Sequence, residues 1–125
     1  SFSSQGLSNL VWAFARSANG DEELFRAVAT ELSTRARDCN PQEMSNIAWA
    51  FATVKMHGTA GIDALFVAAT SSMPEFQPRE LASLLWAHVT LEHESAELFV
   101  RAARTSARRI SDFGARDLAD LAWAF

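Results

Sequence analysis

The 125-residue sequence has few residues that interrupt helices and a single cysteine. Three prolines and five glycines allow long helices, because these two residue types are the least favourable in a helix interior. With Cys39 alone, no internal disulfide framework is possible, and a reducing compartment fits. No apolar run approaches the roughly 18 residues that a membrane-spanning helix needs. No signal or transit peptide is visible, and we expect no membrane insertion.

A surplus of basic residues is also missing. Fifteen acidic and eleven basic side chains give a formal net charge of −4. This balance counts mildly against nucleic acid as a partner, because phosphate binding usually needs a basic face. It is not decisive, since the charge on one face matters more than the total. A hydrophobic content of 49% predicts a folded chain rather than a disordered one.

The sequence does contain a repeat, which its four tryptophans mark. Trp12, Trp49, Trp86 and Trp123 follow one another at intervals of 37 residues, each within a similar apolar segment such as 47–51. A fixed period between about 20 and 50 residues indicates a solenoid or a related array. We divide the chain into units 2–38, 39–75 and 76–112, with a partial unit at 113–125.

Each unit opens with the pattern of a helix start. In the second unit, Asn40 is the expected N-cap, Pro41 the first helical residue and Glu43 the partner of a capping box. An apolar residue before the cap is followed five positions later by another, which is the spacing of a hydrophobic staple. These pairs are Phe2 with Leu7, Cys39 with Met44, Phe76 with Leu81, and Phe113 with Leu118. In the first unit the pattern predicts a helix over about 4–17.

A Leu-Phe pair marks the second helix of each complete unit. The pairs are Leu24-Phe25, Leu65-Phe66 and Leu98-Phe99. The second pair is displaced by four residues from the 37-residue register, and a long connection, Lys55–Asp63, precedes it. We expect this connection, with its two glycines, to be the least regular segment. The helix after it should be correspondingly shorter and end near Met73-Pro74.

Helical hairpins of this size stack side by side, because one pair cannot bury its apolar face alone. The sequence therefore predicts an all-α fold, an α-solenoid of helix-turn-helix repeats with a right-handed superhelix. An isolated hairpin or an ordinary bundle is the alternative. Neither end shows a polar capping repeat, so we expect further repeats or another domain beyond this stretch.

Groupings of residues that carry catalysis are absent from the sequence. His57, His88 and His93 lack metal-ligand spacing, and one cysteine cannot build a zinc cluster. No glycine-rich phosphate loop or nucleophile motif occurs. We expect no enzymatic activity, no catalytic residues, no metal, no cofactor and no small-molecule substrate. Because His88 replaces a core phenylalanine of the other units, we expect it to be a buried imidazole with its hydrogen bonds satisfied.

One family resemblance rests on the start of the third unit. Residues 76–87 read Phe-Gln-Pro-Arg-Glu-Leu-Ala-Ser-Leu-Leu-Trp-Ala. This motif resembles the octotricopeptide repeat, and the period is similar to that of its 37-residue relative, the heptatricopeptide repeat. The resemblance implies an α-solenoid in a mitochondrion or chloroplast that binds single-stranded or ribosomal RNA and acts in RNA processing, stability or translation. Some such proteins are instead subunits of organellar ribosomes. A protein-protein scaffold in a large organellar assembly is therefore the alternative.

The first helix of each unit supplies the candidate RNA contacts, on the stripe opposite its apolar cluster. Amides, hydroxyls and guanidinium groups suit base edges or phosphates, and one residue set per unit would present one set per base. A solvated helix face is the alternative. The candidates are Gln5, Asn9 and Arg16 in the first unit, Gln42, Asn46 and Thr53 in the second, Arg79, Ser83 and Thr90 in the third, and Arg116 in the fourth.

Two further features of the sequence bear on RNA binding. The tryptophans fall near the same stripe, where they would stack on bases or, as we expect, pack against the next unit. In the second helix of the third unit, Arg101, Arg104 and Arg108 are spaced i, i+3, i+7, with Arg109 beside them. Such a basic stripe suits phosphate or an acidic partner. A solvated outer face is the alternative.

Overall fold

A computed structural model describes residues 3–16, 22–55, 60–91, 96–109 and 114, and the regular structure in these residues is helical throughout. The α-helices are α1 (Ser4–Arg16), α2 (Glu22–Arg35), α3 (Pro41–Thr53), α4 (Ala60–Ser72), α5 (Pro78–Thr90) and α6 (Ala96–Arg108). Short 3-10 segments, Ala36–Asp38 and Met73–Glu75, follow α2 and α4. The all-α class is thus confirmed. Apart from Gly114, the predicted fourth unit lies outside the described residues.

Capping hydrogen bonds that involve side chains fix the starts of α1, α3 and α5. The Ser3 hydroxyl accepts a hydrogen bond of 3.0 Å from the backbone three residues later. At α3, the Glu43 backbone N–H donates to Asn40 Oδ1 at 2.8 Å, and the Asn40 N–H donates to Glu43 Oε1 at 2.9 Å. At α5, the Gln77 N–H donates to Glu80 Oε1 at 2.8 Å. These bonds satisfy backbone donors that a helix start leaves without partners.

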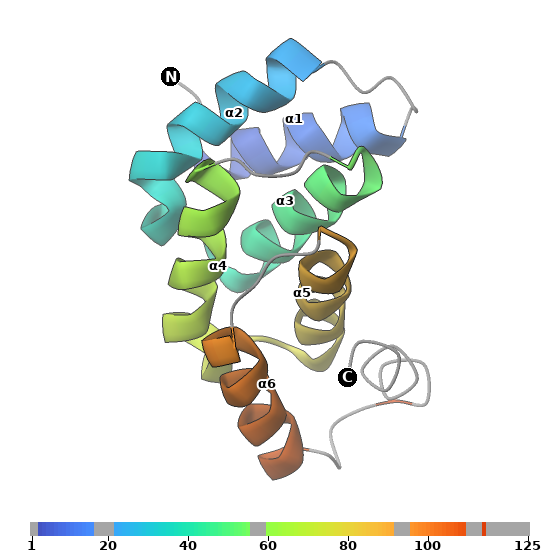
Figure 1. Cartoon of the computed structure of the whole chain (residues 1–125). Coiled ribbons are helices and arrows are strands. Elements are labelled where there is room, and N and C mark those ends of the chain that lie inside the picture. The colour runs from blue at the N-terminus through green and yellow to red at the C-terminus, as the bar shows by residue number, and fades with distance from the viewer. Residues whose placement is uncertain (1–2, 17–21, 56–59, 92–95, 110–113, 115–125) are drawn as a thin grey trace.

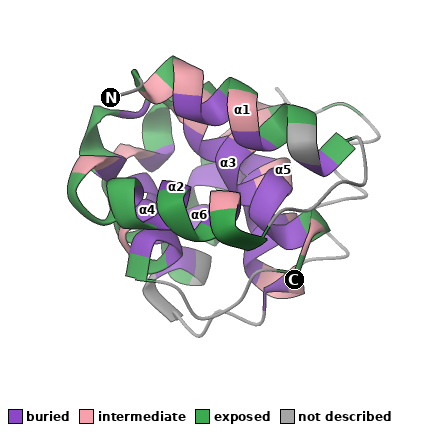
Figure 2. Ribbon diagram, turned by 90° about the horizontal axis from the view of Figure 1, so that it is seen from above, coloured by how far each residue is buried: buried purple, intermediate pink, exposed green. Residues whose placement is uncertain are grey.

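The helices lie in two layers. Helices α1, α3 and α5 pack side by side in that order, α2, α4 and α6 form the second row, and α3 also packs on α4 (Figure 1). Each row turns its buried faces inward, and α3 is the most enclosed helix (Figure 2). One side of α1, α3 and α5 consequently remains on the surface.

Two aromatic contacts join the layers in the same way. The rings of Phe25 in α2 and Phe51 in α3 meet edge to face, with centroids 5.1 Å apart. One unit later, Phe66 in α4 meets His88 in α5 in the same geometry at 5.0 Å. His88 has no exposed surface, which confirms that it is buried in place of a core phenylalanine. The expectation that all its hydrogen bonds are satisfied is not confirmed, because no partner for its Nδ1 is found among the described residues.

Residues 56–59 of the predicted irregular segment Lys55–Asp63 lie outside the described residues, and the rest of the segment from Ala60 onward is helical. Helix α4 begins at Ala60, inside that segment, and its 13 residues equal the length of α6, so the expected shortening of this helix is wrong. Gly61 is a buried residue within this helix. A Cβ atom at Gly61 would lie 2.1 Å from the carbonyl oxygen of Ala29 in α2. The glycine therefore serves the close approach of two helices, rather than a loop.

Helix α3 ends in a left-handed residue. Its C-cap is Val54, and the next residue, Lys55, has a φ of 58°. The Lys55 N–H donates to the carbonyl of Ala52 at 3.1 Å. A residue in this conformation stops a helix and turns the chain away, although a side chain makes the conformation costly.

Candidate nucleic-acid interface

The predicted polar stripe on α1 lies on the surface. Gln5, Asn9, Trp12 and Arg16 are all exposed. Their spacing of i, i+4, i+7 and i+11 places them within an arc of about 60° at about 100° per residue. The stripe thus contains a tryptophan at its centre, with amides toward the N-terminus of the helix and an arginine at its end.

The corresponding residues of α3 and α5 lie at the same positions along their helices but are less exposed. Gln42, Thr53 and Arg79 are exposed, whereas Asn46, Ser83 and Thr90 are half-buried. The Thr53 hydroxyl donates to the carbonyl of Trp49 at 2.8 Å, so its proton is used within its own helix. Arg116 lies outside the described residues.

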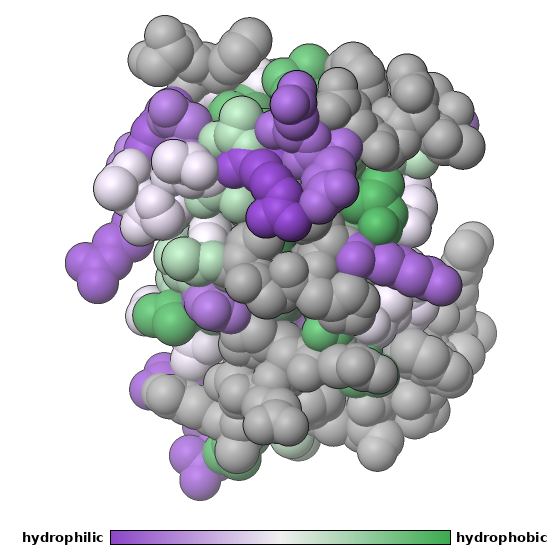
Figure 3. Space-filling view, turned by 45° about the horizontal axis from the view of Figure 1, so that its top comes forward, coloured by the Kyte–Doolittle hydropathy of each residue, from purple (hydrophilic) through white to green (hydrophobic). Residues whose placement is uncertain are grey.

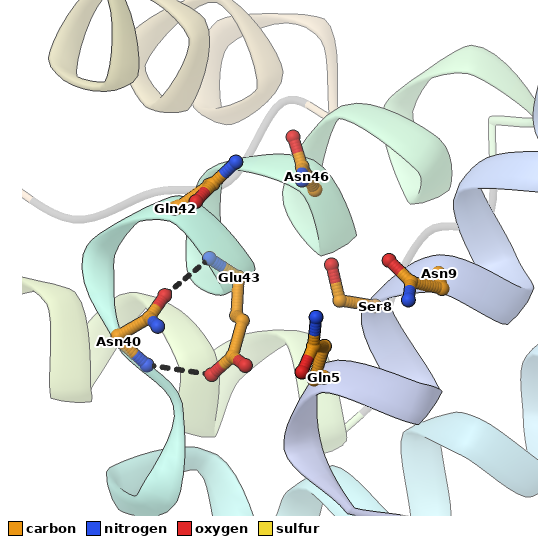
Figure 4. A pocket seen from close by; sticks show the side chains of 7 residues that line it. All are labelled: Gln5, Ser8, Asn9, Asn40, Gln42, Glu43 and Asn46. Atoms are coloured by element: carbon orange, nitrogen blue, oxygen red, sulfur yellow. Dashed lines mark hydrogen bonds between the residues drawn. The ribbon is translucent and has the colours of Figure 1, made fainter.

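The structure brings four of the candidates together in one pocket. Gln5 and Asn9 from α1 face Gln42 and Asn46 from α3 across a hollow with a volume of about 180 Å³ (Figure 4). Ser8, Asn40 and Glu43 complete the lining. The pocket therefore lies at the junction of two units, whereas the sequence suggested a separate set of contacts on each unit.

The chemistry of this pocket is that of neutral amides. Five of its seven lining residues are Asn or Gln, each of which offers N–H donors and a carbonyl acceptor. Among the lining residues only Glu43 is ionisable, and its carboxylate accepts the hydrogen bond of the α3 capping box. The pocket is thus suited to an uncharged ligand edge with both donors and acceptors, and less suited to an anion.

Sequence reasoning missed Ser8, Asn40 and Glu43 as pocket residues. Asn40 and Glu43 were assigned only to the helix start. Ser8 is almost fully buried, and its counterpart one period later, Ser45, donates to the backbone carbonyl of Glu80 at 2.9 Å. That bond joins α3 to α5. The recurrence of serine at this position was the one signal in the sequence that pointed to the junction.

Trp12 and Trp49 pack against each other from two consecutive units. The rings of Trp12 and Trp49 lie 6.5 Å apart at 42°, which confirms packing against the next unit. Trp49 and Trp86 are half-buried against the core. Trp12, however, keeps 38% of its surface exposed, and the guanidinium of Arg16 lies 4.7 Å from its ring centre. Packing, a cation over the ring and partial exposure therefore occur together at Trp12.

The basic stripe on α6 has three exposed arginines rather than the four that the sequence suggested. Arg101, Arg104 and Arg108 are exposed, as expected for a surface stripe. Arg109 is half-buried, and its Nη1 donates to the backbone carbonyl of Phe76. Its inclusion in the stripe is wrong, because this bond ties the end of α6 to the residue before the N-cap of α5.

Other kinds of site find little support in the described part of the chain. No group of three or more His, Cys, Asp or Glu residues there is placed to hold a metal ion. None of the helices described is long and apolar enough to cross a bilayer. Cys39 is buried, and burial, with smaller contributions from Glu43 and Asp38, raises the pKa of its thiol to about 11. A thiol of this kind is a poor nucleophile near neutral pH.

The sequence profile of the family described as "Tbc2 translation factor, N-terminal domain" matches residues 11–122. The chain belongs to this family. The match runs from α1 through α6 and so includes the pocket-lining residues of α3. Among the curated proteins compared with the chain, none matches it.

Membership in the Tbc2 N-terminal domain family corrects the resemblance to octotricopeptide and heptatricopeptide repeats. The motif at 76–87 resembles those repeats because it contains residues that start a helix and residues that anchor the helix in the core. Phe76 and Leu81 are fully buried, and Glu80 accepts the capping hydrogen bond of Gln77. Such residues are required wherever a helix starts in this way, so they do not distinguish one helical family from another.

Proposed function

We propose that this member of the Tbc2 N-terminal domain family binds single-stranded RNA through the exposed face of α1, α3 and α5, and that it acts in translation within a mitochondrion or chloroplast. The observation that carries the proposal is the amide-lined pocket between α1 and α3, because side-chain amides read base edges. Ribosomal RNA is included among the possible targets. The name of the family supports the translation part.

The same proposal includes the finer architecture. We propose an α-solenoid of 37-residue helix-turn-helix repeats, wound into a right-handed superhelix. Two features support it: α3 and α5 begin at Pro41 and Pro78, which are 37 residues apart, and like helices pack in the same order in both layers. We also propose binding rather than catalysis as the task of the segment.

A charge-matched pair of double variants tests the RNA face. Arg16→Gln with Arg79→Gln removes two positive charges from the α1–α3–α5 face, and Arg104→Gln with Arg108→Gln removes two from α6. Affinity for a labelled single-stranded RNA is measured by fluorescence anisotropy over a series of salt concentrations. If both arginines of the first pair contact phosphate, the slope of log K against log salt falls by about 1.4. Equal losses from both pairs, or no RNA binding by the unaltered protein, would refute the assignment.

A protein-protein scaffold is the second candidate. The net charge of −4 favours it, and so do two exposed valines on the second layer, Val67 at 64% and Val100 at 46% exposure. On the face drawn in Figure 3, however, the apolar areas among the described residues are small and separated by hydrophilic side chains. Cross-linking of the native assembly distinguishes the two candidates. Cross-links from the pocket face to protein alone would support the scaffold.

A further inference from the structure

We infer that the pocket between α1 and α3 holds a single nucleobase by its edge, so that this base is read by the junction of two consecutive units rather than by one unit. This inference rests on the proposed function and specifies its ligand. Gln5 and Asn9 come from the first unit, and Gln42 and Asn46 from the second (Figure 4). Neither helix alone encloses the pocket.

The charges around the pocket select a base over a phosphate. Among the described residues no Lys, Arg or His lines it, and the Glu43 carboxylate lies in its wall. A phosphate group would meet this negative charge with no cation to offset it. A base edge is neutral and presents adjacent donors and acceptors, which side-chain amides match. The capping box holds Asn40 and Glu43 in place, so this wall is already formed before binding.

An accessible aromatic ring lies one helical turn beyond the pocket. Trp12 follows Asn9 by three residues on the same stripe and is partly exposed. Base stacking on such a ring is sequence-tolerant, because every base has a π-face. Arg16, above the Trp12 ring, adds a positive charge at this point. A neighbouring base that takes the place of Arg16 over the ring stacks on Trp12, while the base in the pocket is read by hydrogen bonds.

The next junction carries different chemistry at the same positions. On α5, Arg79 stands where α3 has Gln42, and Ser83 stands where α3 has Asn46. Arg79 is exposed, so the α3–α5 junction presents a guanidinium group where the α1–α3 junction presents an amide. We assign base-edge reading to the first junction and a phosphate contact to the second. The two junctions thus serve as matched controls for one another.

The test compares Asn46→Ala with Arg79→Gln on two kinds of RNA. The probes are oligoribonucleotides of about 12 nucleotides, one homopolymer for each base, and a strand of the same length in which every base is absent. We expect Asn46→Ala to weaken binding to at least one homopolymer about tenfold, with an unchanged salt slope. It should not change the weak binding of the base-free strand. Arg79→Gln should lower the salt slope on both kinds of probe.

Three controls separate loss of RNA contact from loss of folding. Ser71→Ala, on the exposed surface of α4, should change neither quantity. Circular dichroism checks the fold, and Gln5→Ala, at an exposed site, replaces Asn46→Ala if that variant melts early. The inference is wrong if the amide variants weaken the base-free strand equally, or if they change the salt slope. If the unaltered protein binds all homopolymers and the amide variants change none, only the inference fails. No binding to any RNA would overturn the proposed function as well.

Discussion

Gly61→Ala should destabilise the protein, although the same change stabilises most exposed helices. Gly61 lies in the first turn of α4, and a Cβ atom there would come within 2.1 Å of the Ala29 carbonyl oxygen and 2.7 Å of the carbonyl carbon. These are backbone atoms of α2, which cannot rotate away as the end of a side chain would. The two helices would have to separate.

The magnitude follows from two opposing terms. Overpacking of a tight contact costs about 1–3 kcal/mol, and the upper end applies because backbone must move. Alanine recovers about 1 kcal/mol of helix propensity over glycine. The net loss is about 2 kcal/mol. For 125 residues, an unfolding entropy of about 2.1 cal/mol/K per residue converts this loss into a decrease in Tm of about 8 °C.

Thermal unfolding followed by circular dichroism measures the effect, with Val67→Ala as the control. Val67 is 64% exposed on the same helix, and its substitution should change stability by less than about 0.5 kcal/mol. A second variant, Gly61→Ala with Ala29→Gly, should stay destabilised, because the contact is with the Ala29 backbone and not its methyl group. An increase in Tm for Gly61→Ala, or full rescue by Ala29→Gly, would refute the reasoning.

Further changes have equally direct outcomes. Lys55→Gly should raise the free energy of unfolding by about 1 kcal/mol in urea titrations, because φ is 58°. Asn40→Ala should lower it by about 1 kcal/mol by removing the α3 cap, and Ser45→Ala should lower it by a similar amount through the lost bond to α5. Because burial raises the pKa of Cys39 to about 11 from 9.0, the unfolded state loses its thiol proton first, and stability should fall between pH 9 and 11. Cys39→Ala should abolish that slope.

The helix starts were predictable because they depend on local chemistry. A cap at Asn40, a proline after it and an acid at Glu43 specify the beginning of α3 within four residues, and no distant contact is needed. The start of α4 depends instead on tertiary packing. Gly61 looks like a loop residue in the sequence, and only the approach of the Ala29 backbone shows that it belongs to a helix contact.

The candidate site was predictable in composition and not in arrangement. Helical spacing placed Gln5 and Asn9 on one stripe, and the period placed Gln42 and Asn46 on another. That these stripes enclose one pocket depends on how α1 and α3 pack, which a repeat period does not specify. Arg109 failed for a related reason. Its neighbours on α6 suggested a surface charge, but its guanidinium reaches the backbone carbonyl of Phe76, just before the start of α5 in the same unit.

Small buried residues recur along the first layer of helices, and one of them, Ser8, also lines the pocket. At one repeated position the chain has Ser8, Ser45 and Ala82, and all three are nearly fully buried. Small side chains there let α1, α3 and α5 approach closely, as small residues do at other tight helix contacts. The Ser45 bond to Glu80 then fixes the second approach. The spacing of the exposed amides and tryptophans is therefore a consequence of core packing, and selection for RNA contact would act on buried residues as well as on the stripe itself.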